Sequence, residues 1–140
     1  MLMAGFREHE HTADWELEAW AEDLPGLLEQ AARGMFTLSG AYLQTGPRQQ
    51  RQFRIQAADA ESLLVRFLSE LLFISQKDGL GFDFYQLEMQ DGAENGLLLG
   101  AMVEGAALAS IDKEIKAVTY HNLAIRQEAG VLRARVVFDV

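Results

Sequence analysis

Two segments in the first half of the chain repeat apolar residues every three or four positions, and this periodicity restricts the fold more than any other feature. They span residues 24–36 and 63–74, and such spacing is typical of helices that bury one face. Elsewhere, apolar and polar residues alternate in short runs, as in half-buried strands. Strands around two main helices, followed by a run of strands alone, predict an α+β fold with a mixed or antiparallel sheet. We expect residues 1–140 to form one domain.

Both helices have recognisable ends. Asp23 stands two residues before Pro25, and a capping aspartate followed by a proline in the first turn is a typical helix start. Asp59 is expected to cap the second helix. The first helix should end before Gly40 and the second at the turn that contains Gly79, because glycine readily adopts the left-handed conformation that ends a helix.

Period-two alternation predicts the strands. They cover residues 15–21, 53–57, 82–84, 87–89, 97–103, 115–125 and 131–140. The polar stretch 91–96 and the pair Ala129-Gly130 contain turn-forming residues and should connect neighbouring strands.

Composition excludes several classes of protein. Cysteine is absent, which excludes disulfides, thiolate metal sites and a cysteine nucleophile, and which is compatible with a reducing cytoplasm. No run of about 18 apolar residues occurs, so no membrane-spanning helix is expected. Residues 1–10 lack the apolar centre of a secretory signal. These features predict a cytoplasmic protein without a membrane partner.

The chain is acidic, with 21 acidic and 12 basic residues and a formal net charge of −9. Proteins that bind RNA directly gain much of their affinity by neutralising phosphates with lysine and arginine. The clearest basic clusters are Arg48, Arg51 and Arg54, and Arg133 and Arg135. The charge balance therefore favours a protein, metal or other cationic partner over nucleic acid.

Three short segments carry uncommon polar groups beside strands, and the first is residues 9–14, His-Glu-His-Thr-Ala-Asp. Alternate positions of an extended chain share one side, so His9 and His11 are spaced as in the histidine pairs of metal sites. The alternative is a turn in which Thr12 or Asp14 hydrogen-bonds backbone amides. The local sequence by itself favours the turn.

The second segment is residues 114–121, Glu-Ile-Lys-Ala-Val-Thr-Tyr-His. On a strand, Lys116 and Val118 would share one face, and Ile115 and His121 the other. A lysine among apolar residues either extends its ammonium group into solvent or has a function, and the local pattern favours solvent. His121 could be a hydrogen-bonded core residue or a group that titrates near neutral pH.

The third segment is residues 134–140, Ala-Arg-Val-Val-Phe-Asp-Val, at the end of the sequence. The side chain of Asp139 and the terminal carboxylate of Val140 are close together, and two carboxylates repel each other unless a cation lies between them. Hard cations such as calcium collect oxygen ligands of this kind. The alternative is a frayed, solvated terminus.

Together, the three segments resemble those of the archease family. Each is a weak signal alone, but all three in this order, in a chain of 140 residues, are very specific. Residues 31–36 in the first helix also look like the family's, so the resemblance covers practically the whole chain. One departure is visible, because the family often has a small or aliphatic residue and a glycine where this chain has Trp15 and Glu16. That departure leaves the fold in place and could alter the rim of the site.

The resemblance implies an accessory protein and not an enzyme. Archeases assist the RNA ligase that joins 2′,3′-cyclic-phosphate or 3′-phosphate ends to 5′-hydroxyl ends through a GMP-histidine intermediate in tRNA splicing. They promote guanylylation of the ligase and so permit multiple turnover. The expected partner is therefore the ligase protein, and RNA would be met only indirectly through it.

The resemblance also implies site residues. A divalent cation, usually calcium, would be held by Asp14, Asp139 and the terminal carboxylate of Val140. Lys116 matches the family lysine that is expected to be needed for activation. His11 and His121 are candidates for a supporting role around the metal.

Two other functions compete with this interpretation. A stand-alone metal-dependent hydrolase would use Asp14 and Asp139 as ligands and His11 or His121 as general base. The chain has no HExxH motif, nucleophile elbow or clustered histidine set, which weakens that hypothesis. A general folding chaperone would need an exposed apolar patch, and the sequence shows no unpaired apolar stripe.

Overall fold

The computed structural model describes residues 3–9, 14–91, 94 and 96–140, in two helices and nine strands. The elements in chain order are β1 (Gly5–His9), β2 (Trp15–Ala21), α1 (Leu24–Leu38), β3 (Tyr42–Leu43), β4 (Gln49–Ala57), α2 (Ala60–Asp78), β5 (Leu80–Gln90), β6 (Leu97–Ser110), β7 (Ala117–Thr119), β8 (Arg126–Glu128) and β9 (Val131–Asp139). The predicted α+β class is confirmed.

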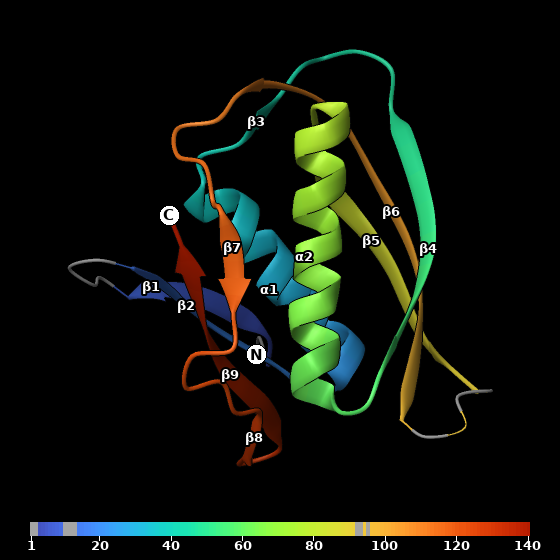
Figure 1. Ribbon diagram of the computed structural model, residues 1–140, viewed down its shortest axis with the longest axis vertical. Helices are drawn as coiled ribbons and strands as arrows, with labels where there is room; N and C mark the ends of the chain where they lie inside the picture. Colours follow the sequence, from blue (N-terminus) through green and yellow to red (C-terminus); the bar gives the residue numbers. More distant parts are fainter. Residues whose placement is uncertain (1–2, 10–13, 92–93, 95) are drawn as a thin grey trace.

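The strands form two separate sheets instead of one. A five-stranded sheet has the order β1-β2-β9-β7, with β8 also paired to β9. A four-stranded sheet has the order β3-β6-β4, with β5 also paired to β6. The strand pairs are antiparallel. The two helices lie between the sheets, with α1 against β1 and β2 and α2 against β4 (Figure 1).

The helix ends follow the predicted capping residues. The Asp23 carboxylate accepts a hydrogen bond of 2.8 Å from the Gly26 N–H, and Pro25 lies in the first turn of α1. The Asp59 carboxylate accepts one of 2.7 Å from the Ser62 N–H at the start of α2. Gly79 ends α2 in the left-handed conformation, with φ 66°. These local interactions satisfy backbone groups that a helix end leaves unpaired.

The core joins both sheets to the helical layer. The apolar stripes of α1 and α2 are buried, as predicted. From the five-stranded sheet, β2 and β9 contribute alternate residues that are nearly or fully buried: Leu17, Ala19, Ala134, Val136 and Phe138. Burial of this kind is the main favourable contribution to folding.

The strand boundaries differ from the prediction in the second half. Residues 82–84 and 87–89 belong to one strand, β5, whose pairing with β6 shifts between Phe82 and Phe84. This irregularity changes which side each residue faces, so Phe82 is buried and Phe84 is 44% exposed. Bulges break the period-two pattern in this way. The short strands β1, β3 and β8 were not predicted, because their sequences lack a long alternating run.

The predicted strand over residues 115–125 is largely wrong, because β7 spans only Ala117–Thr119. The backbone N–H groups of Asp112 and Lys113 donate to the carbonyl of Ser39 at 2.9 and 3.0 Å, which fixes an irregular path before β7. Ile115 is therefore buried and Val118 also packs on the core, although they were expected on opposite faces.

Within the described ranges, neither helix has the length and apolar content that a membrane span requires.

Two phenylalanines on α2 allow a matched test of the core. Phe67 is fully buried and Phe73 is 58% exposed. We expect Phe67→Ala to lower the free energy of unfolding by about 3–5 kcal/mol, through lost burial and the cavity left behind. The same substitution at Phe73 should change it by about 0.5 kcal/mol or less. Urea unfolding measures both, and equal effects would contradict the placement of α2.

The cap of α2 predicts a dependence of stability on pH. The hydrogen bond from the Ser62 N–H stabilises the Asp59 carboxylate and lowers its pKa in the folded protein. Its contribution is therefore present above the pKa of the unfolded chain, about 3.9, and is lost as the pH falls through the folded value. Asn caps helices without titrating. The stability difference between wild type and Asp59→Asn should thus be constant near neutral pH and change in acid, and a pH-independent difference in urea unfolding would refute this role.

Candidate functional site

Strand β9 lies in the middle of the five-stranded sheet, and its end lies beside the starts of β2 and β7. Phe138 pairs with Trp15 of β2, and Asp139 pairs with Ala117 of β7. Asp14 directly precedes Trp15, so it lies beside Asp139 at the end of the sheet. On the other side, the Lys116 N–H donates a hydrogen bond of 2.8 Å to the Asp139 carbonyl. Figure 1 shows this end of the sheet at the label C, where β9 ends beside the start of β7.

The last residues of the sequence are held by their neighbours. Phe138 is fully buried, and Val140 packs against the core as a partly buried residue. Asp139 is exposed, but its backbone is paired with β7. The alternative of a frayed terminus therefore does not describe this structure.

The residues at this sheet end have donor groups that suit a hard cation. Asp14 is half-buried and Asp139 is exposed, and carboxylate oxygens are preferred ligands of calcium. Within the described residues, no group of three or more histidine, aspartate or glutamate side chains is placed to hold a metal. The predicted metal ligands include only two such side chains, those of Asp14 and Asp139. The third predicted ligand is a terminal carboxylate at Val140, which is not a side chain.

The two predicted histidines are not both at this place. His121 follows β7, which runs away from Asp139, since Thr119 already pairs with Val137. The His121 N–H donates to the Thr119 hydroxyl at 3.3 Å, and its Nε2 lies 3.3 Å from the Asn122 amide nitrogen. His121 is thus placed apart from Asp139, and His11 lies outside the described residues.

His9 does not occupy this sheet end either. Its Nε2 lies 3.4 Å from the Glu18 carboxylate. Glu18 is 7% exposed and also contacts Arg7 at 2.9 Å. These charged contacts lie on the outer face of the sheet. They account for the position of His9, so no bound metal is needed to explain it.

A further pair at the same sheet end was not predicted. The Nζ atom of Lys113 lies 4.7 Å from the centre of the Trp15 ring, which is a cation–π contact. Lys113 belongs to the irregular segment 111–116 between β6 and β7 that Ser39 fixes. The sequence does place two lysines within four residues here. It could not show that the first of them meets Trp15, 98 positions earlier.

The predicted basic clusters are largely neutralised. Arg48 binds Asp83 and Glu104, and its hydrogen bonds to Asp83 above all raise its pKa further. Arg51 pairs with Asp78 at 3.2 Å. In the other cluster, Arg133 and Arg135 lie within 4 Å of acidic groups on β2 and β8. Arginines that are matched by carboxylates have little charge left for nucleic acid, in agreement with the acidic balance.

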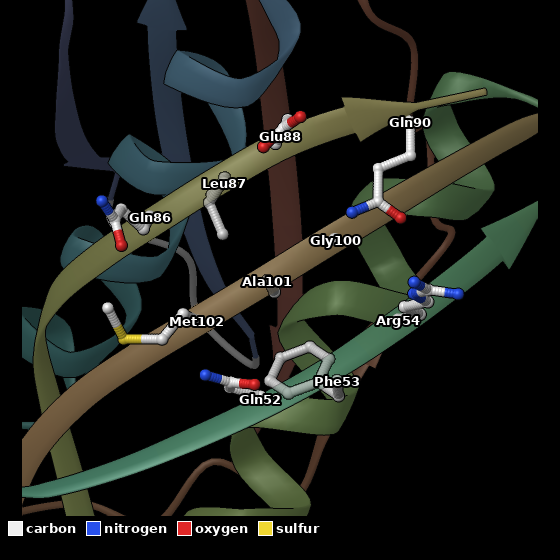
Figure 2. A pocket seen from close by; sticks show the side chains of 10 residues that line it. All are labelled: Gln52, Phe53, Arg54, Gln86, Leu87, Glu88, Gln90, Gly100, Ala101 and Met102. Atoms are coloured by element: carbon white, nitrogen blue, oxygen red, sulfur yellow. The ribbon is translucent and has the colours of Figure 1, made fainter.

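A large hollow lies elsewhere, on the outer face of the four-stranded sheet (Figure 2). It measures about 570 Å³, and Gly100 lies at its centre with the Gln90 amide across it. Its polar lining consists of amides, one guanidinium and one carboxylate: Gln52, Gln86, Gln90, Arg54 and Glu88. None of the predicted site residues that the structure describes lines it. We therefore place the candidate site at the end of the five-stranded sheet, where distant charged residues meet.

Comparison with known proteins shows the family of this chain. The model of the archease protein family matches residues 6–140. The protein archease of Methanosarcina mazei is 33% identical over 135 residues, which cover 94% of this chain and 92% of that protein. The protein archease of Methanothermobacter thermautotrophicus is 32% identical over 141 residues, with 99% and 100% covered.

Solved structures share the fold. The solution structure of Methanobacterium thermoautotrophicum protein 1598 has a TM-score of 0.79 at 30% identity and covers 97% of this chain and 99% of its own. The crystal structure of an archease from Thermotoga maritima, described as a possible chaperone, has a TM-score of 0.68 at 22% identity, with 96% of each chain covered. Since the family match extends from Phe6 to Val140, this protein belongs to the archease family.

Proposed function

We propose that this protein activates a tRNA-splicing RNA ligase by promoting its guanylylation, so that the ligase can turn over many times. The observation that carries the proposal is the meeting of Asp14, Asp139 and Lys116 at one end of the five-stranded sheet. The family resemblance assigns Lys116 to activation and Asp14 and Asp139 to the divalent cation. They come from three distant parts of the sequence, and β9 aligns them.

The arrangement suits work on a phosphorylated partner site. A calcium ion, when bound by Asp14, Asp139 and a terminal carboxylate at Val140, would supply positive charge for phosphate oxygens. Lys116 is exposed and can offer its ammonium group as a point charge to phosphate. The acidic surface would favour approach to an electropositive ligase site through complementary charge. RNA would then be met only within the ligase complex.

The two alternatives have less support. A stand-alone hydrolase needs a general base within reach of the reacting water, and His121 lies away from Asp139. A general chaperone needs a continuous apolar surface. Large exposed apolar side chains in the described part of the chain come from five separate segments: Tyr42, Phe73, Phe84, Ile111 and Tyr120. A protein that assists one client, the ligase, fits these observations better, and it would not be an enzyme itself.

The first test concerns Lys116. With excess nicked RNA, substoichiometric wild-type protein should raise the guanylylated fraction of the cognate ligase and its number of turnovers. Lys116→Ala should abolish the increase while changing the free energy of unfolding by about 1 kcal/mol or less, because the side chain is exposed and the backbone hydrogen bond is retained. Lys77→Ala, at an exposed lysine on α2, is the matched control and should activate normally.

Two outcomes of the Lys116 test would contradict these expectations. Equal turnover with and without the wild-type protein, in the presence of an active ligase, would refute the proposed function. A folded Lys116→Ala variant that activates as wild type does would show that this lysine only extends into solvent.

The second test concerns the cation. A ligand that binds only the folded state raises stability, by about 2.7 kcal/mol at a concentration one hundred times the Kd. A protein that ends at Val140 should therefore melt at a higher temperature in calcium than in chelator. Asp14→Asn, or a short extension after Val140, should lose most of that increment, since affinity at oxygen sites depends on ligand charge.

Asp91→Asn serves as the control for the cation test. Asp91 is exposed and directly follows β5, whose end lies across the molecule from the label C in Figure 1. This variant should keep the full calcium increment. An extended protein that also keeps it would eliminate the terminal carboxylate as a ligand, and the absence of any increment in wild type would eliminate the calcium site.

A further inference from the structure

Lysines are rare in this chain, and most of them gather at the candidate site. The sequence has three lysines, and Lys113 and Lys116 are two of them. No ion pair within 4 Å involves either one among the described residues. Most arginines, by contrast, face carboxylates. On a protein with a net charge of −9, Lys113 and Lys116 therefore offer two cationic groups that form no ion pair within the described residues, although Asp112 and Glu114 lie in the same segment.

Both lysines are fixed by the backbone at the same end of the five-stranded sheet. The Lys113 N–H donates to the Ser39 carbonyl at 3.0 Å, which ties the segment to the end of α1. The Lys116 N–H donates to the Asp139 carbonyl at 2.8 Å, which ties it to β9. The segment thus reaches from the helical layer to the carboxylates and presents one lysine near each end.

The side chain of Lys113 is also oriented. Its Nζ atom lies 4.7 Å from the centre of the Trp15 ring. Trp15 pairs with Phe138 and so stands one residue from both Asp14 and Asp139. Free lysine side chains sample many rotamers, and a contact with an aromatic face reduces that freedom. Trp15 therefore holds the Lys113 ammonium group at the end of β2 that pairs with the end of β9.

We propose that Lys113 is a second phosphate-contacting residue of this site, that it acts together with Lys116, and that Trp15 is the residue that positions it. The inference rests on the proposed function, and it adds a residue pair that the motifs do not include. The ligand class is a phosphate group, either of the ligase's nucleotide or of an RNA end. Trp15 is one of the two positions at which this chain departs from the family pattern.

Electrostatics makes phosphate binding dependent on the cation. Asp14, Asp139 and a terminal carboxylate at Val140 carry three negative charges, and Asp112 and Glu114 of the segment 111–116 add two, against two positive charges on Lys113 and Lys116. An anion is repelled by that excess of three negative charges, and a bound divalent cation reduces the excess to one. Phosphate should therefore bind more tightly in the presence of calcium than in chelator.

Trp15 supplies a direct optical probe that needs no ligase. The chain has two tryptophans, so Trp20→Phe leaves Trp15 as the sole emitter. In this background with calcium, inorganic pyrophosphate should change Trp15 emission as the Lys113 ammonium group moves from the ring to the anion. Lys113→Ala should weaken the apparent affinity about tenfold or more, as expected for loss of a charge-assisted contact. Lys113→Arg should keep part of it, and Lys77→Ala should keep all of it.

Two further ligands distinguish the sources of the phosphate. GTP and a short oligoribonucleotide with a 3′-phosphate are titrated in the same way, and each should compete with pyrophosphate if its phosphate is the natural ligand. Competition by either supports the site and identifies its source. No response of Trp15 emission to pyrophosphate with calcium, or an unchanged affinity in Lys113→Ala, would overturn the inference.

The ligase assay separates this inference from the proposed function. Lys113→Ala and Trp15→Leu should both lower the number of turnovers, and Trp15→Phe should restore most of the activity because it keeps an aromatic face. Thermal melting confirms that each variant is folded. If wild type raises turnover and Lys113→Ala does so equally, only the inference fails. If wild type does not raise turnover, the proposed function fails, and the emission titration still decides whether Lys113 binds phosphate.

Discussion

The pairing of β9 with β2 on one side and β7 on the other is the interaction on which the rest of the structure depends. It places the end of the sequence in the interior of a sheet, where Val136 and Phe138 are fully buried. Buried strands have well-defined positions because slipping by one residue would turn their apolar side chains to solvent. The same register sets Asp139 beside Asp14 and Lys116. Stability and the candidate site therefore have one structural origin.

The irregular segment 111–116 brings Lys113 and Lys116 to the end of the sheet at which β9 places Asp139. A regular strand through it would have continued the pairing with β9 and sent its side chains alternately to both faces. Its hydrogen bonds to Ser39 instead connect the end of α1 to the sheet. Ile115 is buried in the core, while the lysines on either side of it keep unpaired charges. Most arginines, by contrast, are held by carboxylates.

Sequence periodicity and capping residues predicted the two helices well, because both depend on neighbours within a few positions. The bounds of α1 and α2 follow Asp23, Asp59 and Gly79 closely. Strands were predicted less well, because pairing joins distant segments. The bulge near Asp83 and the short β7 depend on contacts with β6 and Ser39 that no local pattern contains. The division into two sheets has the same cause.

The sequence by itself determined the α+β class, the helix ends, the acidic balance and the identity of Asp14, Lys116 and Asp139 as candidate residues. These properties are local or additive along the chain. Only the tertiary structure decided that these residues meet, that His121 lies elsewhere, and that Lys113 rests on Trp15. The physical reason is that antiparallel register and the path of an irregular segment are fixed by the packing of the whole core. A contact across 98 positions is a result of that packing and has no signature in either segment alone.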